Sequence, residues 1–263
     1  PSGINYGSLM TICLVWGMAG SFVSLFISKW MAKTMYGVQV LETHGPYGSL
    51  VQKVHMLSKR AGISKMPEVG IYDSPEANAF ATGASKNNSL VAVSTGLMNQ
   101  MSDDELEGVL AHEVAHVANG DMVTMALVQG VVNAFVMFFA RIVTFAIDNF
   151  LRGDDEEGSG LGFFASMFVN MALQVIFGIL AAPIVMGFSR WREYRADAGS
   201  AQLAGKEKMI AALEALKRNY NQLGDAESSV KAMQISSKES FMELFSSHPP
   251  LEKRIQALKK LSR

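Results

Sequence analysis

Three long apolar stretches constrain the fold of this chain more than any other feature of its sequence. They cover residues 9–28, 122–147 and 161–188, and Arg141 is the one charged side chain inside them. A helix needs about 20 apolar residues to cross the hydrocarbon core of a bilayer, and each stretch is long enough. Helices of a large soluble core are the alternative, but they usually keep a polar face, which these stretches lack. We therefore predict three transmembrane helices.

The charges that flank these stretches predict an orientation in the membrane. Lys29 and Lys33 follow the first stretch, and Arg190 and Arg192 follow the third, whereas the connection 148–160 is mostly acidic. Basic flanks are retained on the cytoplasmic side of a membrane. We therefore expect the acidic loop on the outer side of the membrane and both polar regions of the chain in the cytoplasm.

The polar regions have the patterns of a mainly α, α+β protein. Tyr47–Ala61 has helical apolar spacing, and Val69–Tyr72, Ala77–Ala81 and Leu90–Ser94 are short and bounded by turns, which predicts a small β-sheet. Asn87-Asn88 is placed to form a hairpin turn between the last two strands. The expected domains are a transmembrane region over 1–30, a cytoplasmic core over 31–121, a transmembrane hairpin over 122–188 with the outer loop 148–160, and a cytoplasmic helical region over 189–263, which includes a polar loop near 224–237.

Composition excludes several classes of function. The net charge of −1 offers no basic excess to meet phosphates, so we expect no nucleic-acid partner. Cys13 is the single cysteine, which excludes an internal disulfide and a cysteine-rich zinc site. Any metal ion must therefore be bound by histidine and carboxylate ligands.

The stretch His112-Glu113-Val114-Ala115-His116 carries the strongest chemical signal in the sequence. Ser102 and Glu105 fit a capping box and Gly120 fits a C-terminal cap, so we expect one helix between them. The spacing of four places both imidazoles on one helix face, where they can bind one zinc ion, with Glu113 beside them as the general base. A core helix with two incidental histidines is the alternative, but burying unpaired imidazoles is costly.

Two histidines leave such a site incomplete, because catalytic zinc takes three protein ligands. Glu193 is the best candidate for the third, since the hairpin of the second and third apolar stretches leaves the histidine helix and returns at this residue. Asp197 shares the helix face of Glu193 and could accept the second N–H of a ligating histidine. A charged helix start, in which Arg192 and Arg195 pair with these acids, is the alternative.

Four separated motifs resemble those of the HtpX-type membrane metalloproteases, the bacterial relatives of the CAAX prenyl proteases. The first two are the histidine motif and, after the apolar hairpin, Glu193-Tyr194-Arg195-Ala196-Asp197. The others are Ser247-His248-Pro249-Pro250 with Arg254, and Asn78-Ala79-Phe80. They occur in family order, and the resemblance covers essentially the whole chain.

The resemblance implies a cytoplasmic zincin-like metalloprotease domain joined to transmembrane helices. It also implies that Glu193 is the third ligand of one Zn²⁺ ion and that Asp197 holds a ligating histidine. The strand Asn78, Ala79, Phe80 and Ala81 would bind substrate backbone by strand addition. His248 and Arg254 would steady substrate or the developing oxyanion, unless they are only a loop histidine and a solvated helix charge. Family members carry four membrane helices, so we expect one more helix upstream of Pro1.

These observations together predict an integral-membrane zinc endopeptidase of the bacterial inner membrane. It would cleave membrane or misfolded proteins at the cytoplasmic face, in heat-shock-linked quality control, with polypeptide substrates and the lipid bilayer as its partners. The sequence does not indicate an oligomeric state. One alternative is a prenyl-protein processing protease with the same chemistry. The other is a catalytically inactive zinc-binding membrane scaffold, which would have no use for the carboxylate of Glu113.

Overall fold

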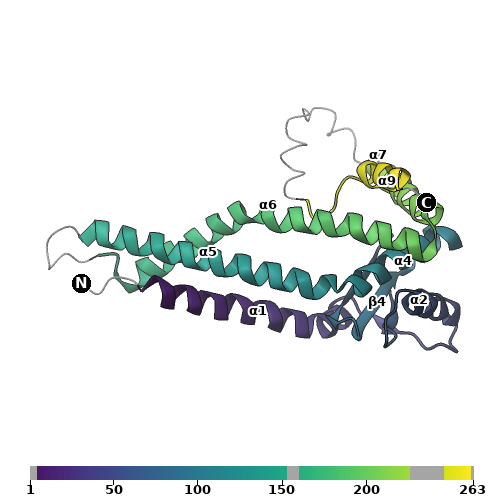
Figure 1. Ribbon diagram of the computed structural model, residues 1–263, viewed down its shortest axis with the longest axis horizontal. Helices are drawn as coiled ribbons and strands as arrows, with labels where there is room; N and C mark the ends of the chain where they lie inside the picture. Colours follow the sequence, from purple (N-terminus) through teal and green to yellow (C-terminus); the bar gives the residue numbers. More distant parts are fainter. Residues whose placement is uncertain (1–4, 153–159, 226–245, 262–263) are drawn as a thin grey trace. The chain divides into compact units, whose positions relative to one another are not determined.

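The computed structural model describes residues 5–152, 160–225 and 246–261 (Figure 1). The chain forms two compact units, one from Pro1–Ser24 and Met125–Gly187 and the other from Leu25–Thr124 and Phe188–Arg263. Most of the acidic loop predicted at 148–160 and of the polar loop predicted at 224–237 lies outside the described residues.

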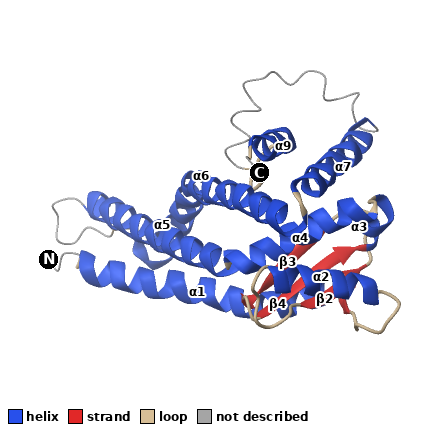
Figure 2. Cartoon of the chain, turned by 45° about the vertical axis from the view of Figure 1, so that its right-hand side comes forward, coloured by secondary structure: helices blue, strands red, loops and turns tan. Residues whose placement is uncertain are grey.

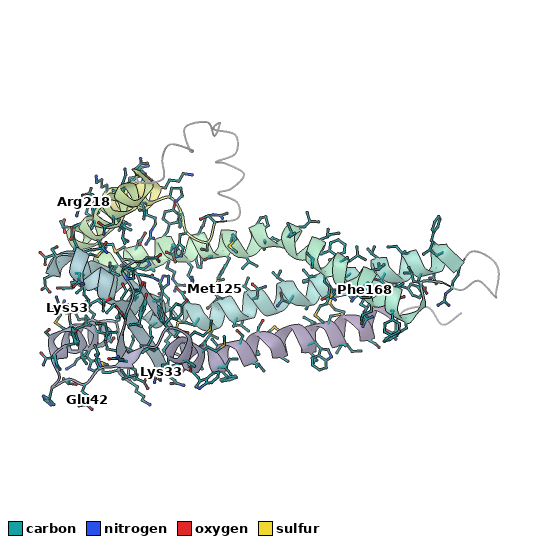
Figure 3. All side chains as sticks on the ribbon, turned by 180° about the vertical axis from the view of Figure 1, so that it is seen from behind. Lys33, Glu42, Lys53, Met125, Phe168 and Arg218 are labelled. Atoms are coloured by element: carbon teal, nitrogen blue, oxygen red, sulfur yellow. The ribbon has the colours of Figure 1, made fainter. Side chains whose placement is uncertain are left out.

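The first unit, which we call the membrane unit, consists of parts of three long helices. These are α1 (Tyr6–Met35), α5 (Asp121–Arg152) and α6 (Gly162–Ala204), which run side by side in this unit (Figure 1). Among the described residues, these three helices are long and apolar enough to cross a membrane, which confirms the three predicted spans. Large apolar side chains such as Phe168, which is 59% exposed, project outward from them (Figure 3).

Glycine allows close contact between two of these helices. A Cβ atom added at Gly17 of α1 would lie 2.6 Å from the carbonyl oxygen of Gly130 on α5. Ala134, one turn further along α5, is fully buried. Small residues at helix contacts are the usual means by which membrane helices pack, since lipid tails are as apolar as the side chains they replace.

The second unit, which we call the catalytic unit, is built on a four-stranded sheet in the order β1-β2-β4-β3. The strands are β1 (Gln39–Val40), β2 (Glu68–Tyr72), β3 (Ala79–Ser85) and β4 (Asn88–Ser94). β2 and β4 are parallel, and the outer pairs are antiparallel. The three predicted strands are confirmed, and the two-residue β1 is additional. The hairpin turn falls at Lys86-Asn87, one residue earlier than predicted, because Asn88 already pairs with Ser85.

Side chains alternate between the two faces of the sheet along each strand, and both faces are apolar. Val91 and Val93 of β4 belong to the main core, which also contains side chains of α2 (Gly48–Arg60) and α4 (Asp103–Asn119). Leu90 and Ala92 face the opposite side, where they pack with Tyr72 in a smaller cluster. Figure 2 shows α2, α4 and the short α3 (Thr95–Gln100) beside the strands.

Helices α7 (Lys206–Asp225) and α9 (Leu251–Lys260) complete the catalytic unit. α7 packs against α4 at Gly108, where an added Cβ would lie 2.5 Å from the carbonyl oxygen of Lys208. The pairs Lys53–Asp103 and Arg218–Glu105 join α2 and α7 to the first turn of α4 (Figure 3). α4, which carries the histidine motif, is therefore held at the centre of this unit.

Candidate active site

Helix α4 presents two histidines from one buried face. Its start is fixed by the predicted capping box, in which the Ser102 hydroxyl accepts from the Glu105 N–H and the Glu105 carboxylate accepts from the Ser102 N–H. Its end is fixed at Gly120, whose φ of 73° is the left-handed conformation that glycine adopts at helix ends. Between them the Nε2 atoms of His112 and His116 lie 3.1 Å apart.

The carboxylate of Glu193 reaches these imidazoles from α6. Its Oε1 lies 3.2 Å from Nε2 of His116, and its Oε2 lies 3.5 Å from Nε2 of His112. All three side chains are buried, and one potential ligand atom from each lies within 4.8 Å of the others. α6 delivers Glu193 because it continues as one helix, through Pro183, from the apolar stretch to Ala204.

The donor set fits a divalent cation. Oε1 of Glu193 is buried and makes no hydrogen bond of acceptable geometry, although it faces an imidazole nitrogen. Leaving a buried carboxylate oxygen without a partner is costly, and a cation shared with the two Nε2 atoms removes that cost. Two histidines and one carboxylate are the ligands of a common class of catalytic zinc site.

Each imidazole is also held at its other nitrogen. Asp197 lies 3.0 Å from Nδ1 of His112, and Asp121 lies 2.6 Å from Nδ1 of His116. A carboxylate at Nδ1 keeps the proton there and leaves the Nε2 lone pair for the metal. The two carboxylates thereby fix the orientation of both imidazole rings.

Asp121 is not among the residues predicted from the sequence. It is the first residue of α5, directly after the glycine that ends α4, and its side chain is buried. The signal that could have identified it is a carboxylate five residues after His116, placed by the Gly120 turn to fold back onto the imidazole.

Arg254 contacts two acidic residues of the site. Its guanidinium donates two hydrogen bonds to Asp197, at 2.8 and 2.6 Å, and lies 3.3 Å from Oε2 of Glu193. It is buried at 6% exposure, so the alternative of a solvated helix charge does not describe it. Two parallel bonds between a guanidinium and a carboxylate fix the carboxylate plane, which makes Arg254 a holder of Asp197.

The other charged residues of this region are placed differently. His248 lies with Nδ1 at 2.8 Å from Oε2 of Glu193, while most of its ring remains exposed. Arg192 approaches Glu193 only to 3.7 Å, and Arg195 lies over the ring of Trp191. The partner of Asp197 is thus Arg254, whereas the alternative interpretation of the sequence paired the acids with Arg192 and Arg195.

Protonation in the site follows from the balance of burial and charge. Burial lowers the pKa of His116, but the carboxylates of Asp121 and Glu193 beside its ring outweigh burial and raise the pKa to about 9. A metal ion at Nε2 would displace the proton to which this pKa refers. Burial would raise the pKa of Glu193, but the imidazoles of His112, His116 and His248 around it hold it far below its ordinary value. Glu193 is therefore an anion at any physiological pH, as a metal ligand must be.

A cavity of about 240 Å³ adjoins two of the three converging side chains, His112 and Glu193. Glu113 lines it together with His112, Glu193 and His248, and α7 and α9 supply apolar side chains to its wall. Glu113 is partly exposed, unlike the two histidines beside it. A carboxylate in this position can exchange protons with a molecule that lies in the cavity next to the metal ligands.

The predicted substrate strand forms one border of this cavity. Asn78 and Ala79 line it, and β3 is an edge strand whose second side has no partner strand among the described residues. The backbone of Asn78 is bonded to β4, since its oxygen accepts from the Ser94 N–H. Hydrogen bonding alternates along an antiparallel pair, so the N–H and C=O groups of Ala79 and Ala81 point to the free edge.

Phe80 belongs to a different environment. Its ring packs with Tyr36 and Tyr72, at centroid distances of 5.3 and 5.6 Å, on the opposite face of the sheet. The structure therefore brings the backbone of the predicted strand to the cavity but places the Phe80 side chain in a core.

Comparison with known proteins agrees with this geometry. Residues 46–262 match the model of peptidase family M48. Protease HtpX of Shewanella pealeana is 57% identical over 262 residues, which cover 98% of this chain and 91% of that protein. Protease HtpX of Tolumonas auensis is 55% identical over 259 residues, which cover 97% and 87%.

The chain is also similar to a solved structure, that of Ste24p from S. mikatae. The TM-score is 0.63 at 22% sequence identity, and the match covers 95% of this chain. It covers only 56% of the Ste24p chain, so this chain spans little more than half of that protein. At such identity the likeness shows a shared fold.

Proposed function

The chain belongs to peptidase family M48, and from that premise we propose that it is an integral-membrane zinc endopeptidase which cleaves membrane or misfolded proteins. It is a metallopeptidase, and polypeptides are its substrates. The finer parts of the proposal are zinc as a single ion, the bacterial inner membrane as location, an active site on the cytoplasmic side, and a role in heat-shock-type quality control.

One observation carries this proposal more than any other. His112, His116 and Glu193 converge from two helices, and Glu113 lines the cavity beside them. Zinc bound by these ligands would act as a Lewis acid toward a scissile carbonyl and toward water. The set contains each group that peptide hydrolysis requires at one place, which a purely structural metal site does not need.

The residues of the chain then divide the remaining work. Glu113 accepts the proton of the attacking water and returns it to the amide nitrogen of the leaving group. His248, exposed at the border of the cavity, would donate a hydrogen bond from Nε2 to the substrate oxygen as negative charge develops, in the imidazolium form whose Nδ1–H is donated to Glu193. Asp121, Asp197 and Arg254 hold the ligands, and Arg254 also lines the cavity.

Substrate backbone would be bound by the free edge of β3. The outward N–H and C=O groups of Ala79 and Ala81 can extend the sheet by one strand, which is a mode that does not depend on the substrate sequence. An extended segment in this position runs along the cavity that Asn78 and Glu113 line. Such binding suits an enzyme that handles many unfolded substrates.

The Glu113→Gln variant tests the proposal. Glutamine has the shape of glutamate but cannot accept the proton, so peptide hydrolysis by the purified full chain should fall by at least about a hundredfold. Zinc content should stay at one ion per chain, since Glu113 is not a ligand. Unchanged hydrolysis with zinc retained would refute the general-base role.

A matched variant separates the base from the ligands. Glu193→Gln also replaces a carboxylate by an amide, but here both zinc and hydrolysis should be lost. If Glu193→Gln lost hydrolysis but kept zinc, as Glu113→Gln should, the assignment of Glu193 as a ligand would be contradicted.

The two alternatives have less support. The relatives at 55–57% identity are named Protease HtpX, whereas the likeness to Ste24p is limited to the fold, so a prenyl-protein processing protease is not favoured. An inactive scaffold is opposed by membership of a peptidase family and by Glu113 beside the ligands.

A further inference from the structure

The segment that carries His248 is short and lies at the edge of the candidate active site. It comprises residues 246–250, directly before α9, and contains neither helix nor strand. Its end next to α9 is held by Pro249, which is buried, and by Pro250, whose carbonyl oxygen accepts from two N–H groups of α9. His248 itself is exposed, so its own burial does not fix the position of the imidazole.

The other end of this segment is anchored by Arg190 of α6. The Nη1 atom of Arg190 donates a hydrogen bond of 2.9 Å to the carbonyl oxygen of Ser246, which lies 56 residues further along the chain. The hydroxyl of Ser246 in turn donates a hydrogen bond of 2.7 Å to the carbonyl oxygen of His248. A continuous series of hydrogen bonds therefore leads from the guanidinium to the backbone of His248.

One face of α6 holds both the ring and the backbone of this histidine. Arg190 lies three residues before Glu193, so the two side chains share a helix face and are about one turn apart. Glu193 contacts the ring at Nδ1, while Arg190 holds the segment through Ser246. A contact at Nδ1 alone would let the ring pivot about that nitrogen, and the anchored backbone opposes such a movement. The direction of Nε2, the ring nitrogen left for a substrate, therefore depends on both contacts.

We propose that Arg190 is a positioning residue for peptide hydrolysis, which anchors residues 246–248 to α6 and so directs Nε2 of His248 at the substrate oxygen. This inference rests on the proposed function, in which His248 donates a hydrogen bond to the developing oxyanion. Such a donor must lie about 3 Å from the oxyanion, and a displacement of about 1 Å can lower a rate about a hundredfold. Arginine suits the role because its guanidinium is charged at any physiological pH and forms strong hydrogen bonds.

A role in membrane insertion alone is the competing explanation for this arginine. Arg190 follows the third apolar stretch, and a basic residue there helps to retain that end of the helix in the cytoplasm. A basic flank acts on insertion and stability, so the effect of its loss on hydrolysis would not depend on His248. A positioning residue acts through His248, so its effect should disappear when the imidazole is absent.

The experiment is a double-mutant cycle on the purified full chain with Arg190→Gln, His248→Ala and both changes together. Removal of the oxyanion donor in His248→Ala should lower kcat for a soluble peptide about a hundredfold. Arg190→Gln should lower kcat about tenfold with KM unchanged, because the hydrogen bond that it supports strengthens only in the transition state. In the His248→Ala background, Arg190→Gln should change kcat less than about twofold. All three variants should bind one zinc ion, since His112, His116 and Glu193 are unchanged.

Three further variants locate the effect. Arg190→Lys can still donate to the Ser246 carbonyl and should recover most of the lost kcat. Ser246→Ala removes the hydroxyl bond to the His248 backbone, and it should lower kcat about threefold, again only when His248 is present. Arg195→Gln is the matched control, because Arg195 is an exposed basic residue of the same helix that lies over the ring of Trp191. Its kcat should equal that of the unmodified chain.

The inference is overturned if Arg190→Gln has the kcat of the unmodified chain, or if the effects of Arg190→Gln and His248→Ala multiply in the double variant. Loss of zinc from Arg190→Gln also overturns it, because Arg190 would then support the metal centre and not His248. Should Arg190→Gln fail to fold, the same comparison of rates is made with Ser246→Ala and its combination with His248→Ala. Failure of the proposed function is recognised separately, because the unmodified chain with zinc would then not hydrolyse the peptide.

Discussion

At the scale of single residues, the site separates the three candidate ligands from the groups that hold them. His112 and His116 turn Nε2 toward Glu193, and each is held at Nδ1 by an aspartate. Asp197 is in turn held by Arg254 through two hydrogen bonds. The His116–Asp121 contact is local, whereas Arg254 reaches Asp197 across 57 residues of sequence. The spacing of charged residues therefore predicts which side chains converge better than it predicts the hydrogen-bond partners of those side chains.

Asp121→Asn should weaken metal binding and leave the fold intact. Asparagine still accepts a hydrogen bond from Nδ1 of His116, but without the negative charge that increases the basicity of the ring. Loss of such a partner typically lowers metal affinity about 10- to 100-fold. Competition with a chromogenic chelator measures the change. Asp103→Asn is the control, since Asp103 is an exposed acid at the start of α4 whose ion pair in the described part of the chain is with Lys53.

If Asp121→Asn binds zinc as tightly as the unmodified chain, Asp121 does not hold His116 in the metal-bound state. Equal weakening in Asp103→Asn would instead indicate a general effect of charge on the helix.

At the scale of elements, local signals predict most of the structure that positions the site. The capping box of Ser102 and Glu105 and the glycine after Asn119 fix both ends of α4 in the sequence, and both are observed. β1 has only two residues, which is too short for a periodic pattern. The continuity of α6 from the apolar stretch to Ala204 is also not evident, because Pro183 and the change to charged residues both suggest an end.

Ala81→Pro tests the free edge of β3. Its N–H points away from β4, so proline should be tolerated there, as it is on edge strands, but it removes one donor to a bound substrate strand. The loss of one hydrogen bond should lower kcat/KM for an extended peptide about fivefold. Steady-state kinetics with a soluble peptide provides the measurement.

Thr82→Pro is the matched variant, because the N–H of Thr82 is turned toward Leu90 of β4. It should lower the melting temperature of the protein more than Ala81→Pro does. An Ala81→Pro protein with unchanged kcat/KM would argue against strand addition at this edge.

At the scale of the whole molecule, the site joins segments that the sequence keeps far apart. The candidate ligands come from α4 and α6. The groups that hold them come from α6, from the first residue of α5 and from α9, so that His112 and the guanidinium of Arg254 meet across 142 residues. The sequence suggests that a distant acid returns to the histidines, because a hydrophobic hairpin leads back to them. It does not indicate that α9 closes the site, since that depends on packing of α9 against α7 through Leu213, Ile255 and Leu258.

Because the metal would link α4 to α6, removing it should destabilise the catalytic unit. An ion that binds only the folded state adds about 4 kcal/mol to the free energy of unfolding when its concentration is a thousand times its Kd. For a protein of this size, that corresponds to a melting temperature about 10 °C lower after treatment with a chelator. Differential scanning fluorimetry in detergent, with and without added zinc, measures the shift.

The two carboxylate variants decide what such a shift means. Glu113→Gln keeps all three ligands, so its melting temperature should respond to zinc and to chelator as that of the unmodified chain does. Glu193→Gln lacks a ligand, and its melting temperature should respond to neither. If the melting temperatures of both variants kept the zinc-dependent shift, the ion would be bound elsewhere. His112, His116 and Glu193 would then converge through contacts among buried side chains and would not form a metal centre.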